Sequence, residues 1–582
     1  MDFFDALTLI GGLCLFLFGM NLMGSALEKR AGGSLKAILT KLTSNKLVGF
    51  AMGLGVTAVI QSSSATTVMV VGFVNSGLMT LHQAVGVIMG ANVGTTVTAW
   101  ILSLTGISGS GFLLQMLKPA SFTPLLALLG IIFYMFCKSD TKKDTGVILL
   151  GFATLMFGMD TMSAAVSGLR DVPEFQAILL KFSNPVLGVL AGLVLTSIIQ
   201  SSSASVGILQ ALSATGQITF GSAIPILMGM DIGTCVTALL SSIGAGRSAR
   251  RAAFVHLYFN VIGTVFYLGV FYGLNAVIHF SFIHDTVDQL SIAIVNTAFK
   301  LGSTALLLPM SGLLERLACL TVPDAHTAEE PNVLDERLLA TPSVAIERCR
   351  TVAGAMAQDS VAALRSALTL IDRYDAAAAA TIRDQEAEVD RFEDLLGTYL
   401  VRLSSHAMSE ADSRESAKLL HIIGDFERIS DHAVNIVQSV EEMRAKQIAF
   451  SDRAREEMRV ICGAIDEILT LSLDAYLSGD LEKAQLVEPL EQVIDTLKEQ
   501  LRNRHILRLQ KGQCTIELGF VWADLLTDLE RVGDHCSNIA GCVMEMAHAS
   551  MDVHQYTSGI RMESPAFHEN FQKFSEKYRL VA

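Results

Sequence analysis

Two copies of one polar motif decide the fold: Gln61-Ser62-Ser63-Ser64-Ala65-Thr66-Thr67 and Gln200-Ser201-Ser202-Ser203-Ala204-Ser205. Each copy lies in a long apolar tract, because residues 47–117 contain no Asp, Glu, Lys or Arg and residues 182–246 contain only Asp231. Uncharged tracts of this length are typical of bilayer-spanning segments. Hydroxyl groups at that depth are costly unless they line a cavity or pair with each other. The sequence therefore predicts a membrane protein that binds or moves a polar species.

Composition divides the 582 residues into an apolar part and a charged part. The average is 51% hydrophobic and 17% charged, but the net charge of −14 comes mostly from the later residues. This acidity argues against nucleic acid as a partner. We assign residues 1–314 to a membrane domain, 315–342 to a linker, 343–550 to a helical domain and 551–582 to a tail without a usable pattern.

The membrane domain contains an internal repeat. An offset of 139 residues carries residues 8–103 onto residues 147–242 without a gap. Gly12 falls on Gly151, and the segment 89–95 falls on 228–234, so that Asn92 is the equivalent of Asp231. Repeated halves are common in secondary transporters, which place the binding site at the interface between the repeats.

Two apolar segments, 47–80 and 186–219, are too long for one crossing, and each is interrupted by a serine motif. We predict that each forms a re-entrant hairpin, because non-helical backbone at that depth is tolerated only where it lines a protein cavity. Each repeat with its connector then crosses the membrane three times, which inverts the second repeat. In this topology the basic residues near 29–46, 138–143 and 247–251 fall on one face of the membrane, which the positive-inside rule assigns to the cytoplasm. We therefore predict a multi-pass protein of the cell inner membrane whose C-terminal domain is cytoplasmic.

The serine motifs suggest a site for an anion and a cation. A hairpin tip exposes the N-terminus of a half-helix, whose free N–H groups attract an anion. Serine hydroxyls donate to anion oxygens and also accept, so they can bind Na⁺. Neither tract contains Lys or Arg, which favours a co-bound cation and hence symport. The alternative is ordinary Ser and Thr packing between membrane helices.

The predicted substrate and ion site combines the two serine motifs with the Gly-containing helix breaks that follow them. Asp231 is the only charged residue of its tract and is expected to bind a cation or carry charge, with a structural hydrogen-bonded role as the alternative. The predicted residues are Gln61, Ser62, Ser63, Ser64, Thr66, Asn92, Thr95, Gln200, Ser201, Ser202, Ser203, Ser205, Asp231 and Thr234.

The paired motifs, with Gly90-Ala91-Asn92-Val93-Gly94-Thr95-Thr96 after the first, resemble the type II sodium/phosphate cotransporter family. The resemblance covers about residues 5–313. It implies a carrier able to form a homodimer, in which the two hairpins supply the sites for inorganic phosphate and for Na⁺ as co-substrate. The second copy departs from the pattern with Asp231-Ile232-Gly233-Thr234-Cys235, so the ion stoichiometry does not carry over.

The charged half shows helical periodicity over 343–371, 376–407, 412–444, 452–478, 481–510 and 517–548. Two similar segments begin at Asp425 and Asp528, and each follows another Glu-x-x-x-Asp pair. Because residues four apart share a helix face, paired helices could offer carboxylates to a metal. The predicted ligands are Glu386, Asp390, Glu427, Asp431, Glu491, Asp495, Glu530 and Asp534.

This half resembles the PhoU family. The resemblance implies two three-helix bundles, a divalent or iron-type metal cluster and a partner in phosphate signalling. We therefore predict sodium-dependent phosphate transport with regulation by a PhoU-like domain, and no enzymatic activity. The alternatives are a membrane phosphate sensor without net transport and a phosphate exporter. A metal-dependent hydrolase in the soluble half is a weaker alternative, because carboxylates alone do not identify a reaction.

Overall fold

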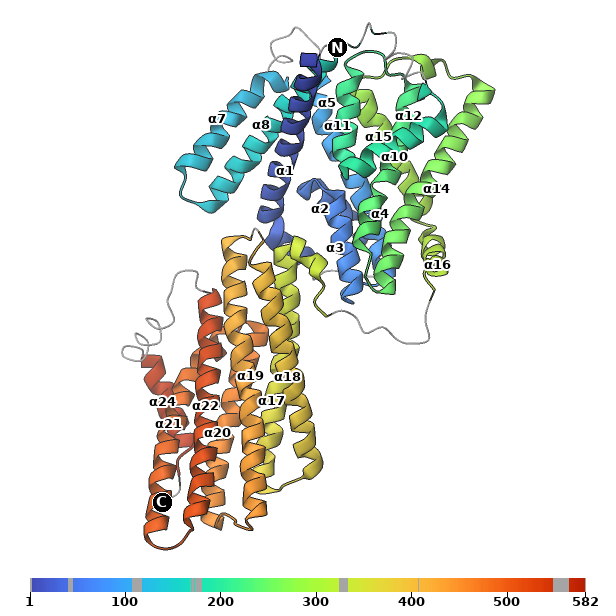
Figure 1. The fold of residues 1–582 in the computed structure, drawn as a ribbon. Coiled ribbons are helices and arrows are strands. Elements are labelled where there is room, and N and C mark those ends of the chain that lie inside the picture. Colours follow the sequence, from blue (N-terminus) through green and yellow to red (C-terminus); the bar gives the residue numbers. More distant parts are fainter. Residues whose placement is uncertain are drawn as a thin grey trace. The chain divides into compact units, whose positions relative to one another are not determined.

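The structure is a computed structural model that describes residues 3–39, 45–106, 118–167, 169, 172, 181–323, 333–406, 408–547 and 565–580. The secondary structure of these residues is helical, apart from one isolated bridge between Thr219 and Thr286. The chain forms two compact units, Met1–Val344 and Ala345–Ala582 (Figure 1). The predicted all-helical fold is confirmed, and the second unit begins close to the predicted residue 343.

The first unit is a membrane-type helical domain. Its described helices include six that are long and apolar enough to cross a membrane: Phe4–Arg30, Leu81–Gly106, Asp140–Ser167, Phe220–Ser241, Arg247–Ile278 and Gln289–Leu307. The element bounds are α1 (Phe3–Leu39), α2 (Lys46–Ile60), α3 (Ser63–Asn75), α4 (Leu81–Gly94), α5 (Thr96–Ser103), α7 (Pro119–Phe136), α8 (Asp140–Ser167), α10 (Pro185–Ile199), α11 (Ser202–Ser213), α12 (Phe220–Gly233), α13 (Cys235–Ser241), α14 (Arg247–Ile278), α15 (Gln289–Leu307) and α16 (Ser311–Thr321).

The first serine motif lies in a helical hairpin made by α2 and α3. Helices α2 and α4 run parallel in close contact: a methyl group at Gly53 would come within 2.0 Å of the Val87 carbonyl oxygen, and one at Gly90 within 2.0 Å of the Phe50 carbonyl oxygen. Since α4 starts beside the start of α2, helix α3 must bring the chain back to the side where α2 began. Glycine at these contacts lets the two backbones touch.

The second motif lies in an equivalent hairpin, α10 and α11. Here a methyl group at Gly192 would come within 2.0 Å of the Ile226 carbonyl oxygen, and one at Gly229 within 2.0 Å of the Val189 carbonyl oxygen. Glycines 192 and 229 are the repeat equivalents of the two glycines that join α2 to α4. The two sequence repeats therefore share the same glycine contacts, between α2 and α4 in the first and between α10 and α12 in the second.

Helices α1 and α8, which are also repeat equivalents, pack antiparallel. A methyl group at Gly19 would approach the Leu155 amide nitrogen within 2.3 Å and the Gly151 carbonyl oxygen within 2.7 Å. One at Gly158 would approach the carbonyl oxygen of Gly12 within 2.7 Å. The contacts are reciprocal, because 151 is the equivalent of 12 and 158 is the equivalent of 19.

The range 315–342, which we interpreted as a linker, contains structure that belongs to the first unit. Helix α16 extends to Thr321 and packs against α14, and a short 3-10 helix, η4, spans Glu336–Ala340. Asp335 is buried and accepts a hydrogen bond from the Asn75 amide at 2.5 Å, at the end of α3. The proline and charge pattern indicated a break in the periodicity, but it did not reveal these contacts.

The second unit consists of α17 (Pro342–Asp372), α18 (Ala376–Leu403), α19 (Glu410–Ala445), α20 (Asp452–Ser478), α21 (Leu481–Gln510), α22 (Ile516–Ala547) and α24 (Pro565–Lys577). The six long helices match the six predicted ranges. Helix α24 lies in the range predicted to be a tail without a pattern, and it packs on α21. The Tyr578 hydroxyl beyond its end donates to the Gly463 carbonyl oxygen of α20 at 3.2 Å.

Candidate functional site

The two hairpin tips have the same backbone conformation. Gln61 ends α2 in the left-handed region with φ 63°, and Gln200 ends α10 with φ 58°. This region costs a non-glycine residue roughly 1 kcal/mol or more, so the surrounding packing must hold it in both copies. The next residue is extended, and its side chain caps the following helix: the Ser62 and Ser201 hydroxyls accept from amide nitrogens three residues on, at 3.2 and 3.3 Å.

The remaining hydroxyls of the motifs divide into two groups. Thr66 donates to the Ser62 carbonyl oxygen and Ser205 to the Ser201 carbonyl oxygen, both at 3.0 Å, so these two hydroxyls already have partners within their helices. Ser63 and Ser202 are the first residues of α3 and α11, and both are buried. Within the part of the chain that the structure describes, their hydroxyls have no hydrogen bond. The same holds for the hydroxyl of the buried Ser203 in the same turn of α11.

The tips of the two hairpins meet. The Ser64 hydroxyl of the first motif donates to the Gln200 carbonyl oxygen of the second at 3.3 Å, although the two residues are 136 positions apart. On the other side, the Thr98 hydroxyl of α5 donates to the Gln61 side-chain oxygen at 2.7 Å. The prediction that both motifs contribute to one place in the fold is therefore consistent with the geometry. Gln200, by contrast, has an exposed side chain.

At the predicted breaks, Asn92–Thr95 and Asp231–Thr234, each helix is interrupted at one residue only, and that residue keeps helical backbone angles: φ −64° and ψ −19° at Thr95, φ −64° and ψ −23° at Thr234. Helix α4 gives way to α5 at Thr95, and α12 to α13 at Thr234. The Thr95 hydroxyl donates to the Asn92 carbonyl oxygen at 2.7 Å, and the Thr234 hydroxyl donates to the Asp231 carbonyl oxygen at 2.5 Å. All four residues are buried, and the two breaks are stabilised in the same way.

The breaks are joined through Asn260 and Lys300, whose spacing in the last two apolar segments suggests either a cavity lining or helix–helix packing. The Asn92 amide donates to the Asn260 side-chain oxygen of α14 at 2.7 Å. Lys300 of α15 lies 3.0 Å from the Asp231 carboxylate, and its ammonium also donates to the Thr95 hydroxyl at 2.6 Å. The side chains of Lys300 and Asp231 are each only 2% exposed. The Asp231 charge is therefore paired, and its second oxygen, Oδ2, is buried without a hydrogen-bond partner among the described residues.

A signal in the sequence could have identified this pair. Lys300 is the only Lys or Arg between Arg251 and Arg316, just as Asp231 is the only charged residue in its own tract. Two isolated opposite charges at membrane depth are expected to pair with each other. The two serine tracts themselves contain no Lys or Arg, so the cation comes from a helix outside them.

In the second unit, the predicted carboxylates of α18 and α19 lie together. The pKa of Glu386 is raised by burial and by the neighbouring carboxylates of Asp431 and Asp390. Burial raises the pKa of Glu427 to about 7, and repulsion and a hydrogen bond from Asp431 add to the effect, followed by the charges of Glu393 and Asp390. Protons thus partly neutralise this cluster near neutral pH.

A second cluster lies on α21 and α22. Burial raises the pKa of Glu491 to about 8, with a further contribution from Asp495 and Asp534. The pKa of Asp534 is also raised, mainly by burial and by Glu530. Lys498, however, lies 2.7 Å from the Glu530 carboxylate and neutralises it.

The convergence of these carboxylates on a metal is not seen. In the described residues, no three His, Cys, Asp or Glu side chains are arranged so that they could hold one metal ion. The helix spacing placed each pair on one face correctly, but like charges repel and Lys498 takes one of the predicted ligands. The metal-binding role of the eight residues stays a prediction.

Two family models match the chain. Residues 15–164 and 168–313 match the model described as Na⁺/Pi-cotransporter, and residues 354–440 and 459–543 match the model of the PhoU domain. The first model covers both serine motifs, both helix breaks and Lys300. The second covers all eight predicted metal ligands.

Similar proteins include one from Salmonella typhimurium named "Putative inorganic phosphate export protein YjbB", which is 24% identical over 551 residues, 93% of this chain and 97% of that protein. The "Sodium-dependent phosphate transport protein 2A" of Rattus norvegicus is 37% identical over 99 residues, 16% of this chain and 15% of that protein. The crystal structure of PhoU from Streptococcus pneumoniae aligns with 36% of this chain and 99% of its own, at 18% identity and a TM-score of 0.32.

Proposed function

The chain belongs to the Na⁺/Pi-cotransporter family, and from this membership we propose that it is a carrier that moves inorganic phosphate across the membrane together with Na⁺. The family consists of transporters and not of enzymes, and it implies a membrane location and phosphate as substrate. The PhoU domain is proposed to regulate the carrier in the cytoplasm. Dimer formation and a partner in phosphate signalling remain part of this proposal.

The contact between the two hairpin tips is the observation that supports the proposal most strongly. Because Ser64 bonds to the Gln200 carbonyl oxygen, the N-termini of α3 and α11 lie close to each other. Each N-terminus carries a partial positive charge and free N–H groups, and each has a buried serine at its first position. Two such ends can bind the oxygens of one phosphate without any Lys or Arg in the hairpins.

We propose that Na⁺ binds near the helix breaks and competes with Lys300 for Asp231. The Oδ2 atom of Asp231 is buried and unpartnered, and so is the hydroxyl of Ser303 on α15, among the described residues. Oxygen atoms of this kind are the ligands that hard cations take. If Na⁺ replaces the Lys300 ammonium at Asp231, Lys300 loses its ion pair. Na⁺ binding would then change how α15 packs against the helix breaks.

We further propose that the two repeats are inverted. Asn75, at the end of the first hairpin, accepts from the amide of Gly246, which precedes α14, at 2.8 Å. Ile218, after the second hairpin, accepts from the amide of Val287, which follows α14, at 2.8 Å. Helix α14 has 32 residues, about 48 Å at the usual rise, so its two ends reach opposite faces of a membrane. The basic residues beside Gly246 favour the cytoplasm for that end.

Cysteine labelling tests this inversion. Leu78 and Gln217 are repeat equivalents in the connections that follow the two hairpins, so single cysteines there, in a cysteine-free background, should react from opposite faces. Leu78→Cys should react only from the cytoplasmic side, together with a control cysteine at Ser139, inside the basic segment 138–143. Reaction of both equivalents from one face would rule out the inverted topology. The positions 36 and 171, which the sequence alone suggested as labels, fall outside the described side chains.

A phosphate sensor and an exporter are the alternatives. Counterflow distinguishes the first, because a carrier in liposomes exchanges external labelled phosphate for internal phosphate and a sensor does not. The proposed carrier should accumulate label when the vesicles are loaded with unlabelled phosphate. In the same vesicles, a reagent that cannot cross the membrane can inactivate only the carriers with one face outward. The direction of transport by the remaining carriers then separates import from export.

We also propose that the acidic clusters of the second unit bind a cation, and the raised pKa values give this a pH dependence. Glu427 and Glu491 have folded pKa values of about 7 and about 8, above the ordinary 4.5. The folded form therefore binds more protons than the unfolded form, and the stability that these groups contribute is full below about pH 4.5 and lost as the pH rises through 7 to 8.

For a fragment of residues 345–582, we expect the melting temperature to be lower at pH 8.5 than at pH 6, by roughly 5 °C. Millimolar Mn²⁺ or Mg²⁺ should restore most of the loss at pH 8.5 and have little effect at pH 6. Glu491→Gln should flatten this pH dependence, whereas Glu499→Gln, at an exposed position on the same helix, should leave it unchanged. An equal response of both variants would show that the clusters are ordinary solvated surface.

A further inference from the structure

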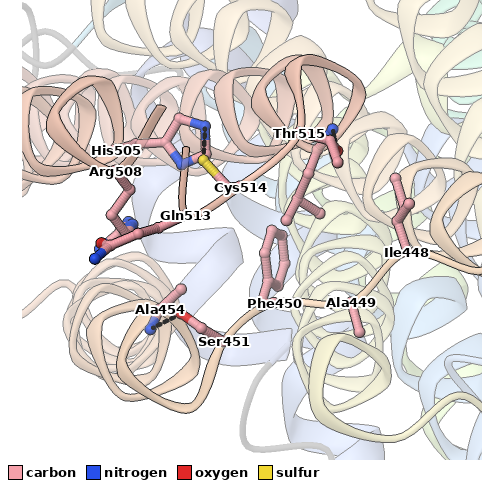
Figure 2. Close-up of a pocket in the computed structure, with 11 residues that line it drawn as sticks. Ile448, Ala449, Phe450, Ser451, Ala454, His505, Arg508, Gln513, Cys514 and Thr515 are labelled. Carbon is pink, nitrogen blue, oxygen red and sulfur yellow. Dashed lines mark hydrogen bonds between the residues drawn. The ribbon is translucent and has the colours of Figure 1, made fainter. Parts of the chain in front are cut away.

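A cavity at one end of the second unit has no role in the proposed transport. It has a volume of about 360 Å³ and lies between the end of α21, the α19–α20 connection and the α21–α22 connection (Figure 2). Its lining is mixed: Phe450, Ile448 and Leu518 are apolar, while His505, Arg508 and Gln513 are polar. Cavities that bind small organic molecules begin at about this size.

The second unit contains an internal repeat, so the residues at the cavity can be compared with the equivalent residues of the other half. Helices α18 and α21 align at the offset that relates Glu386 to Glu491, and their fully buried positions then coincide: Ala379 with Ala484, Ile382 with Val487, Val389 with Ile494 and Leu396 with Leu501. The similar segments that begin at Asp425 and Asp528 align α19 with α22 in the same way.

At the end of the core this agreement stops. Leu400 and Leu403 are fully buried in α18, and their equivalents in α21 are His505 and Arg508. Leu419 is likewise buried in α19, and its equivalent in α22 is Trp522. Three core leucines of one half are thus replaced by a histidine, an arginine and a tryptophan in the other. Since the first half packs well with leucine, folding alone does not require the polar residues.

The replacement is costly. His505 is 6% exposed and the Arg508 side chain 12% exposed, and burying a charge costs several kcal/mol unless it is paired. The buried Glu457 accepts from Arg508 Nη1 at 2.6 Å and from Arg504 Nη1 at 3.1 Å. Arg453 Nε also lies 3.9 Å from Glu457, so three guanidinium groups share one carboxylate. Arg508 Nη2 is buried and has no hydrogen-bond partner among the described residues.

Other groups hold Arg508 and His505 in place. The guanidinium of Arg508 lies 5.3 Å from the centre of the Trp522 ring, and the His505 ring stacks on the same tryptophan at 5.6 Å. Phe450 meets Trp522 edge to face at 5.1 Å. The aromatic packing fixes the cationic group at the cavity before any ligand arrives, which lowers the entropic cost of binding.

From these observations we propose that the cavity binds a small organic phosphate, that is, one phosphoryl group joined to an apolar or aromatic body. Arg508 supplies the excess positive charge and a free N–H donor for the phosphoryl oxygens, and Gln513 lies beside it (Figure 2). The first turns of α20 and α22, capped by Ser451 and Thr515, also open at the cavity. Phe450, with its neighbouring apolar residues, receives the body of the ligand.

The test uses AMP as the probe and isothermal titration of the full-length protein in detergent. AMP should bind at least roughly tenfold more tightly than inorganic phosphate, which lacks the apolar body, and than adenosine, which lacks the phosphoryl group. Arg508→Leu, which installs the residue of the other half, should weaken AMP binding at least roughly tenfold. Arg504→Leu removes another partner of Glu457, one outside the cavity lining, and should leave the affinity within about twofold.

The outcomes are separable from those of the transport proposal. Ser202→Ala should leave AMP binding unchanged, and Arg508→Leu should leave phosphate transport without AMP unchanged. If Arg508→Leu does not fold, His505→Leu and Gln513→Ala should each still weaken AMP binding severalfold. Absence of AMP binding to the native protein, or equal AMP affinity in the cavity variants and the native protein, would overturn the assignment.

Discussion

Ser63→Ala and Ser202→Ala should each lower the initial rate of phosphate transport at least roughly tenfold. Each substitution removes one hydroxyl from the first turn of a half-helix, where a hydrogen bond to a charged ligand contributes about 1.5–3 kcal/mol. Both serine residues are buried, and their hydroxyls have no hydrogen bond among the described residues, so no structural hydrogen bond is lost with them. Rates measured with labelled phosphate in liposomes, at equal amounts of folded protein, give the comparison.

The serine at the other end of α11 provides a matched control. The Ser213 hydroxyl donates to the Gln210 carbonyl oxygen at 2.7 Å within the helix, so Ser213→Ala should change the rate less than about twofold. Loss of transport in Ser202→Ala alone would mean that the first hairpin does not contribute to the site. Full activity in both tip variants would contradict the shared site.

The second large effect is expected at the buried ion pair. Asp231→Asn or Lys300→Met leaves an uncompensated buried charge, which costs about 3–5 kcal/mol, and should sharply reduce both the yield of folded protein and transport. The double variant removes both charges and should recover most of the melting temperature. It should not recover activation by Na⁺, because the proposed cation ligand is gone.

The pair Lys29 and Asp144 is a suitable control, since its side chains are 32% and 19% exposed and it joins α1 to α8 at 3.0 Å. Neutralising either of its members should cost at most about 1 kcal/mol. If the Asp231→Asn and Lys300→Met double variant transports phosphate with unchanged dependence on Na⁺, Asp231 has only a structural role. If the double variant is no more stable than the single ones, the two charges do not stabilise each other.

The sequence predicted those features that depend on local signals. The serine motifs, the hairpins and the breaks at Thr95 and Thr234 follow from uncharged length, glycine spacing and the repeat, and the structure contains them. The six long helices of the second unit follow in the same way from hydrophobic periodicity. Such signals are carried by neighbouring residues, so a single sequence contains them.

The sequence did not predict contacts between distant segments. Lys300 lies on a helix outside both repeats, and its isolation among apolar residues is the one signal for a pair with Asp231, while no signal points to Thr95. The docking of η4 through Asp335 depends on Asn75, far away in the chain. The same limit applies to the predicted metal ligands. The Glu-x-x-x-Asp spacing places two carboxylates on one helix face, but the ion pair between Lys498 and Glu530 depends on tertiary packing.

The most direct test of the account is phosphate uptake by the purified full-length protein in liposomes. With an inward Na⁺ gradient and labelled phosphate outside, a Na⁺-coupled carrier should take up phosphate above the equilibrium level and then lose it as the Na⁺ gradient dissipates. Replacing Na⁺ with K⁺ should abolish this accumulation. A protein that is folded and inserted but shows neither accumulation nor counterflow of phosphate, with or without Na⁺, would contradict the account.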